Sequence, residues 1–151
     1  MDIRVVSESI FDIESDCIVY FVDNAFSSED TMELVSKAGD RLLDVFSKIS
    51  SFATGEFKIV PAFNLKTTYV IISSIPQSIE NEEDEKFLEE IFLNILSGIE
   101  KYEFNTIAVD VTRLSNSYSS KHSEVFKRFL RNVKKDIVVF IHKSGQRYLP
   151  S

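Results

Sequence analysis

The chain has 151 residues, of which 44% are hydrophobic and 27% are charged, and its formal net charge is −7. This length and composition are typical of one globular domain with a sizeable core, so we expect a single domain over residues 1–151. The negative charge argues against nucleic acid as a general partner, because binding to phosphates is dominated by basic side chains. No apolar run approaches the length of a membrane span, so we expect no membrane partner either.

Two rare residue types narrow the chemistry further. The four glycines, Gly39, Gly55, Gly98 and Gly145, are isolated from one another, which excludes a glycine-rich phosphate loop of the Walker, Rossmann or kinase type. Cys17 is the single cysteine; it lies next to an apolar run, which favours a small buried side chain over a catalytic thiol. The N-terminal segment lacks the charge and hydropathy order of a signal peptide, and we therefore expect a cytoplasmic protein.

The first half of the chain contains alternating strand and helix patterns. Residues 3–6 alternate weakly and predict an edge strand, whereas residues 17–22 form a solid apolar run that predicts a central buried strand. An acidic helix start at residues 28–30 opens an amphipathic segment through residue 37. A second helical pattern covers residues 39–52, and we expect its regularly spaced apolar side chains in the core: Leu42, Leu43, Phe46 and Ile49.

The second half repeats this alternation. Strands are predicted at residues 57–60, 69–74, 106–111 and 137–142, and helices at residues 83–100 and 121–135. The first of these helices has one broad apolar face, formed by Phe87, Leu88, Ile91, Phe92, Ile95, Leu96 and Ile99. The acidic run at residues 82–85 suits the start of a helix, which favours a solvated surface over a metal site.

Residues 54–76 carry a motif that points to a family. The segment contains Thr54-Gly55-Glu56, a strand ending at Pro61, then Phe63-Asn64-Leu65, a Tyr69-Val70-Ile71 strand and a closing Pro76. This order resembles the macro domain family. The resemblance implies a three-layer α/β/α fold with a mixed central sheet, and a protein that binds ADP-ribose or hydrolyses its derivatives.

The resemblance also implies where an ADP-ribose site would lie. In the family, an aspartate in a Gly-Asp-Ile turn holds the adenine, and here Ser9 and Ile10 occupy its second and third positions. The small side chains of a family Asn-Ala-Ala-Asn strand end admit the ribose, whereas residues 20–23 read Tyr-Phe-Val-Asp and are followed by Asn24. Asp23 and Asn24 keep hydrogen-bonding capacity, although a strand end capped by an Asp-Asn turn is the commoner explanation of such a pair.

Both loops that surround phosphate in the family lack glycine in this chain. Residues 25–31 replace the first, and residues 110–118 replace the second. In the second loop the resemblance makes Arg113 a candidate phosphate partner. It implies that Ser115 and Asn116 border the ligand crevice at the strand ends, and that Tyr118 lies near the aromatic position of the family. The adenine-stacking position at the end of the last strand falls on Ile141 or His142, although a histidine there is more often structural.

Three hypotheses of function remain open. We favour a divergent, non-catalytic binding or interaction module whose ADP-ribose site is lost or altered. The alternatives are a module that binds ADP-ribose or a related nucleotide and, with less support, an ADP-ribosyl hydrolase. No catalytic constellation, cofactor or metal site is indicated. The sequence leaves the partner unknown, with a nucleotide and a protein as the candidates, and the separate acidic and basic segments, residues 80–90 and 127–135, are the sequence feature that favours a protein.

Overall fold

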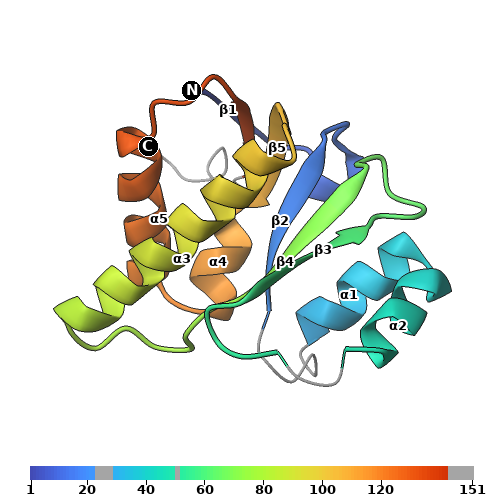
Figure 1. Ribbon diagram of the computed structural model, residues 1–151, viewed down its shortest axis with the longest axis horizontal. Helices are drawn as coiled ribbons and strands as arrows, with labels where there is room; N and C mark the ends of the chain where they lie inside the picture. Colours follow the sequence, from blue (N-terminus) through green and yellow to red (C-terminus); the bar gives the residue numbers. More distant parts are fainter. Residues whose placement is uncertain (23–28, 50–51, 143–151) are drawn as a thin grey trace, which may run out of the picture.

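A mixed sheet forms the centre of the computed structural model, which describes residues 1–22, 29–49 and 52–142. Within these residues the sheet has six strands in the order β1-β6-β5-β2-β4-β3 (Figure 1). Neighbouring strands are parallel except for β3, which runs antiparallel to β4. The strands are β1 (Asp2–Val6), β2 (Cys17–Val22), β3 (Phe57–Pro61), β4 (Tyr69–Ser74), β5 (Thr106–Asp110) and β6 (Val138–His142).

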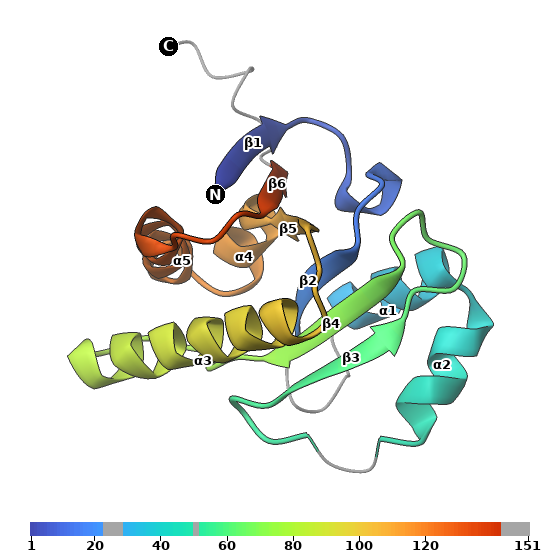
Figure 2. The same ribbon diagram turned by 45° about the horizontal axis from the view of Figure 1, so that its top comes forward.

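Helices cover both faces of this sheet. One face carries α1 (Glu29–Ala38) and α2 (Asp40–Ser47), and the other carries α3 (Glu82–Lys101), α4 (Val111–Ser117) and α5 (Ser120–Asn132) (Figures 1 and 2). A short 3-10 helix, η1 (Ile10–Asp12), connects β1 with β2. This arrangement confirms the predicted α/β/α class with a mixed central sheet. In the part of the chain that is described, no helix combines the length and apolarity needed to cross a membrane.

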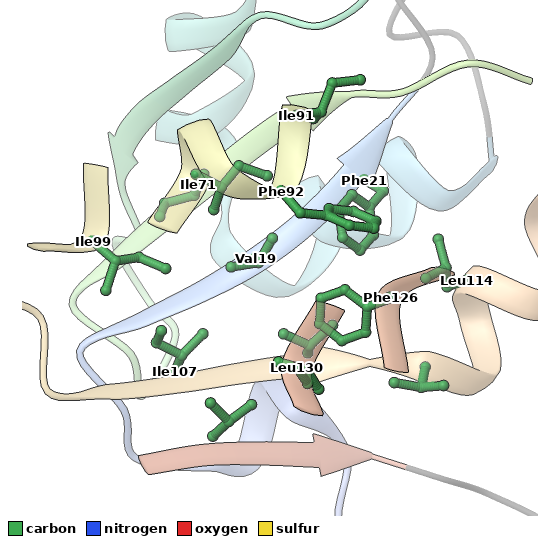
Figure 3. Close-up of a cluster of buried hydrophobic side chains, with 14 of the residues drawn as sticks. Val19, Phe21, Ile71, Ile91, Phe92, Ile99, Ile107, Leu114, Phe126 and Leu130 are labelled. Carbon is green, nitrogen blue, oxygen red and sulfur yellow. The ribbon is translucent and has the colours of Figure 1, made fainter. Parts of the chain in front are cut away.

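The central strand β2 explains why the core has two halves. All six of its residues are buried, as expected for a parallel strand covered on both faces. Cys17, Val19 and Phe21 belong to the core under α3, α4 and α5, whereas Ile18 and Tyr20 belong to the core under α1 and α2. Figure 3 shows Val19 and Phe21 directed toward the helices of the first of these clusters.

The predicted helix faces are largely correct but too wide. On α2, Leu42 is fully buried, whereas Leu43 is 47% exposed. On α3, Phe92 is 2% exposed, whereas Phe87 is 41% exposed. Leu43 follows the fully buried Leu42 and Phe87 precedes the fully buried Leu88, and one residue turns the side chain by about 100° around the helix axis. They therefore lie at the margins of the apolar faces.

The predicted loop at residues 110–118 is wrong, because most of this segment forms α4. Asp110 caps the helix, and its Oδ1 accepts a hydrogen bond from the Arg113 backbone N–H at 2.8 Å. Val111 and Leu114 lie three residues apart and are both buried, so they give the helix one apolar face. The lack of glycine in this segment is consistent with the helix.

Candidate functional site

The carboxyl ends of the parallel strands form the natural place for a site in this fold. Strands β2, β5 and β6 end at Val22, Asp110 and His142, and the register pairs Asp110 with His142. Ligands of open α/β sheets usually bind at this edge. Asp23 and Asn24, which follow β2, lie outside the described residues, as does the predicted loop up to residue 28.

Arg113 occupies the end of β2. Its Nη2 donates a hydrogen bond to the carbonyl oxygen of Phe21 at 2.6 Å. The guanidinium carbon lies 3.9 Å from the ring centroid of Tyr20, which is a cation–π contact. Because Tyr20 is only 1% exposed, it forms a fixed platform for the guanidinium group. The first turn of α4 therefore positions a cation directly against the carboxyl end of β2.

Ser9, Ile10 and His142 come together at the other side of the edge. Ser9 caps η1, and its Oγ accepts a hydrogen bond from the backbone N–H of Phe11 at 3.3 Å. Ile10 is 2% exposed and packs in the core. His142 Nδ1 donates a hydrogen bond to the carbonyl oxygen of Glu8 at 2.7 Å, which ties the end of β6 to the segment before η1. These polar groups are therefore already engaged within the protein.

The other three candidates of the segment 110–118 lie apart from this group. Ser115 Oγ forms a short hydrogen bond with Ser123 Oγ on α5. Asn116 is exposed. The ring of Tyr118 lies 5.2 Å from the ring of His122, also on α5. Ser115 and Tyr118 thus contact the neighbouring helix, whereas Arg113 contacts β2.

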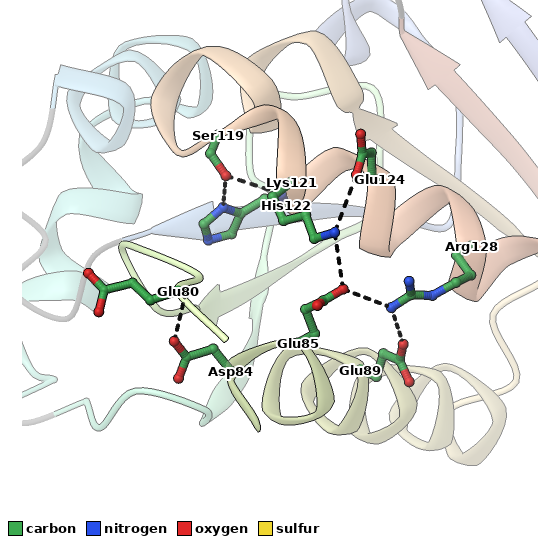
Figure 4. Close-up of polar contacts among 9 residues, drawn as sticks. All are labelled: Glu80, Asp84, Glu85, Glu89, Ser119, Lys121, His122, Glu124 and Arg128. Atoms are coloured by element: carbon green, nitrogen blue, oxygen red, sulfur yellow. Dashed lines mark hydrogen bonds and ion pairs between the residues drawn. The ribbon is translucent and has the colours of Figure 1, made fainter. Parts of the chain in front are cut away.

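His122 is a buried polar residue whose contacts the sequence did not reveal. It has no exposed surface, and its Nε2 donates to the carbonyl oxygen of Pro76 at 2.7 Å. Its Nδ1 accepts a hydrogen bond from Ser119 Oγ at 2.6 Å (Figure 4). Burial lowers the pKa of His122, while the Pro76 carbonyl acts in the opposite direction. The neutral ring thus ties the start of α5 to the segment after β4, which is a structural role.

The acidic and basic segments of the surface pair with each other. Glu85 on α3 lies 3.4 Å from both Lys121 and Arg128 on α5, and Arg128 also contacts Glu89 at 2.5 Å (Figure 4). Farther along the same helices, Lys135 contacts Glu100 at 3.2 Å. Part of the charge segregation that suggested a protein partner, namely Glu85, Glu89, Arg128 and Lys135, is therefore used within the chain. Among the residues described, no cluster of three or more histidine, cysteine or acidic side chains is arranged to hold a metal ion.

Comparison with solved structures identifies the fold. The chain is similar to the Trypanosoma brucei macrodomain in complex with ADP, with a TM-score of 0.76 and 19% identity, covering 97% of this chain and 66% of that one. It is also similar to the Oceanobacillus iheyensis macrodomain with ADP, with a TM-score of 0.81 and 15% identity, covering 95% of this chain and 83% of that one. These identities show a shared fold. The chain spans about two thirds of the Trypanosoma brucei structure.

The sequence comparison supports the same assignment. No curated protein sequence matches the chain. The model of the family described as Macro domain matches residues 31–111. This match covers more than half of the chain, and it includes β3, β4, β5 and the motif at residues 54–76. The chain therefore belongs to the macro domain family.

Proposed function

We propose that this macro domain is a non-catalytic binding or interaction module whose ADP-ribose site is lost or altered. The observation that carries the proposal is the position of Arg113. Its side chain spans from α4 to the end of β2, where it bonds to Phe21 and stacks on Tyr20. A ligand that approached this strand end closely would have to displace the guanidinium group.

The cost of that displacement supports a weakened site. A hydrogen bond from a charged donor contributes about 1.5–3 kcal/mol, and a cation–π contact contributes about 0.5–2 kcal/mol. Even the lower sum, about 2 kcal/mol, would reduce affinity more than tenfold. Ser9 and His142 are also engaged in internal hydrogen bonds, so adenine recognition through them would require further rearrangement.

The absence of a recognisable catalytic group supports the non-catalytic part of the proposal. Within the described ranges, His122 and Ser119 bond to each other, but the second ring nitrogen of His122 is committed to a carbonyl oxygen. A buried histidine held in this way has no nitrogen left to receive a proton from a substrate or water. We expect no measurable release of ADP-ribose from a mono-ADP-ribosylated protein at micromolar concentrations of this chain.

One observation favours the alternative, a module that binds ADP-ribose or a related nucleotide. Arg113 is a cation at the carboxyl ends of the strands, and a guanidinium group binds phosphate well through paired donors. The similar Trypanosoma brucei macrodomain is known in complex with ADP-ribose. If Arg113 rotated toward a ligand, the contact with Tyr20 would be replaced by an ion pair with phosphate.

Calorimetric titration with ADP-ribose distinguishes the two functions, because they predict different effects of Arg113→Ala on the affinity. The titration compares the unmodified chain, Arg113→Ala, and Arg131→Ala as a control at an exposed arginine of α5. If Arg113 blocks the site, the unmodified chain shows no micromolar binding, and Arg113→Ala binds equally weakly or more tightly. Tight binding that Arg113→Ala abolishes would establish the alternative. Tight binding that both variants retain would show a site built from other residues. Circular dichroism checks that each variant is folded.

A further inference from the structure

The edge strand β3 presents unpaired backbone groups along one side. Two hydrogen bonds, one at each end of the strand, show which of its residues bond to β4. Ser74 N–H donates to the Glu56 carbonyl and Ala62 N–H donates to the Thr68 carbonyl, each at 3.1 Å. Because bonded and non-bonded pairs alternate in an antiparallel ladder, Lys58 and Val60 bond to β4. The backbone groups of Phe57 and Ile59 therefore point away from the sheet.

Pro61, the last residue of β3, fits this alternation of bonded and outward-facing residues. It lies two residues after Ile59, so its backbone also faces outward. Proline has no backbone N–H, and at this position none is needed for pairing with β4. The outer edge of β3 thus offers two donors, on Phe57 and Ile59, and three acceptors, on Phe57, Ile59 and Pro61. β3 ends the strand order among the described strands.

A groove of about 580 Å³ runs beside this edge, between β3 and the second half of α3. Phe57 and Ile59 supply apolar side chains from the strand, whereas Asn94 and Ser97 supply polar groups from the helix. Tyr102, which is 56% exposed, lines the groove just after the end of α3. This volume lies within the range of about 300–1,000 Å³ that is typical of ligand-binding pockets.

The depth of the groove depends on Gly98. A β-carbon at Gly98 would lie 2.8 Å from Cζ of Phe57, which is too close for an unmoved ring. The glycine thus allows the Phe57 ring to lie directly against the backbone of α3. With the ring held in this position, side chains from a segment paired to β3 can enter the groove over Phe57 and Ile59.

Exposed aromatic side chains continue the surface beyond the groove. The two exposed rings are connected by the buried Phe104, whose ring lies 6.0 Å from Tyr102 and 5.6 Å from Tyr69. Tyr69 is 39% exposed and pairs with Pro61 across the ladder. Partly exposed aromatic rings are enriched in protein interfaces, where they contribute a large contact area. This row therefore extends the contact surface of β3 at its Pro61 end.

The two charges of the groove have opposite signs and lie toward opposite ends. Glu56 precedes β3, and Lys101 is the last residue of α3, next to Tyr102. The strand and helix run in the same direction here, because Gly55 contacts Phe87 whereas Phe57 contacts Gly98. An antiparallel segment on β3 would therefore begin near Lys101 and end near Glu56.

We propose that β3 and this groove bind an extended peptide segment of a partner protein by strand addition. Charge complementarity defines its chemistry: an acidic residue near Lys101, apolar residues at alternate positions facing the groove, and a basic residue near Glu56. The backbone of the segment pairs with Phe57 and Ile59, which is the usual source of affinity in this mode of recognition. The proposal rests on the proposed function as an interaction module and names the surface and the class of partner.

Selection from a displayed library of random heptapeptides tests the proposal. We expect enrichment of sequences with an acidic start, alternating apolar residues and a basic end. In calorimetric titration with the enriched synthetic peptide, Tyr102→Ala and Ile59→Lys should each weaken binding at least tenfold. Val5→Lys, at a 64% exposed position of the opposite edge strand β1, should bind like the unmodified chain. Tyr102→Ala changes an exposed side chain and remains informative if Ile59→Lys does not fold.

Amide hydrogen exchange locates the contact. The peptide should slow exchange at Phe57 and Ile59, while Lys58 and Val60 are already protected by β4. No enriched sequence, or binding that Tyr102→Ala leaves intact, would overturn the proposal. Protection of Phe57 and Ile59 that rises with protein concentration, without peptide, would instead assign the edge to a second copy of the chain. These results are independent of the ADP-ribose titration, so failure here leaves the interpretation of Arg113 untouched.

Discussion

Replacement of Phe92 by alanine should strongly destabilise the fold. The side chain is 2% exposed, and its ring lies 5.1 Å from Phe126 and 5.8 Å from Phe21, both in edge-to-face geometry (Figure 3). Phe92 thus joins α3 to both β2 and α5. Truncation of a buried phenylalanine costs about 3–5 kcal/mol, because transfer energy is lost and a cavity remains. This cost is a large part of the 5–15 kcal/mol that is typical of whole domains.

Urea denaturation measures this effect, and Phe87→Ala supplies a matched control on the same helix. With a slope of about 1–3 kcal/mol per molar urea, Phe92→Ala should lower the midpoint by at least about 1 M. Phe87 is 41% exposed, so its truncation should cost only about 1 kcal/mol. If the two variants lost the same stability, the aromatic cluster would not be the element that joins α3 to the sheet.

Two further predictions concern polar groups. Because burial lowers the pKa of His122 below its ordinary value of 6.5, the unfolded state binds a proton more readily, so the free energy of unfolding should fall as pH drops below about 6.5. His122→Gln should show a shallower loss between pH 7.5 and pH 5 in urea titrations, and an unchanged slope would contradict this. Asp16 Oδ2 accepts hydrogen bonds from the backbone N–H groups of Asn105 at 2.6 Å and Thr106 at 3.1 Å. Asp16→Ala should therefore cost about 1–3 kcal/mol in thermal or urea unfolding, with Asp16→Asn closer to the unmodified chain.

The strands were predictable because their patterns are local. The run at residues 69–74 is β4 with the same bounds, and the run at residues 17–22 is β2. A continuous apolar run bounded by turn residues has few other solutions in a chain of this length. The predicted helix at residues 83–100 also exists, as α3, because its apolar positions repeat with the helical period. The expectation that Cys17 is buried is confirmed as well.

The candidate site was predictable only in part. The resemblance implied that Ser9, Ile10, Arg113 and His142 border one ligand site; in the structure Ser9 and Ile10 follow β1, Arg113 follows β5, and His142 ends β6. The partners of Arg113 and His142 were not predictable, because they are distant in the chain: Arg113 bonds to Phe21, and His142 bonds to Glu8. The role of Tyr20 was missed for the same reason, because a ring in an apolar run carries no local sign of a cation stacked on it.

The sequence by itself determined the class of the fold, the order of most elements and the loss of glycine from the segments that surround phosphate in the family. These properties depend on periodicity and composition, which act over a few residues. Only the tertiary structure decided that residues 111–117 form a helix, that Arg113 lies on Tyr20, and that Gly98 admits the ring of Phe57 beside an open groove. The physical reason is that each of these outcomes depends on contacts between elements, whose energies arise only when strands and helices pack together.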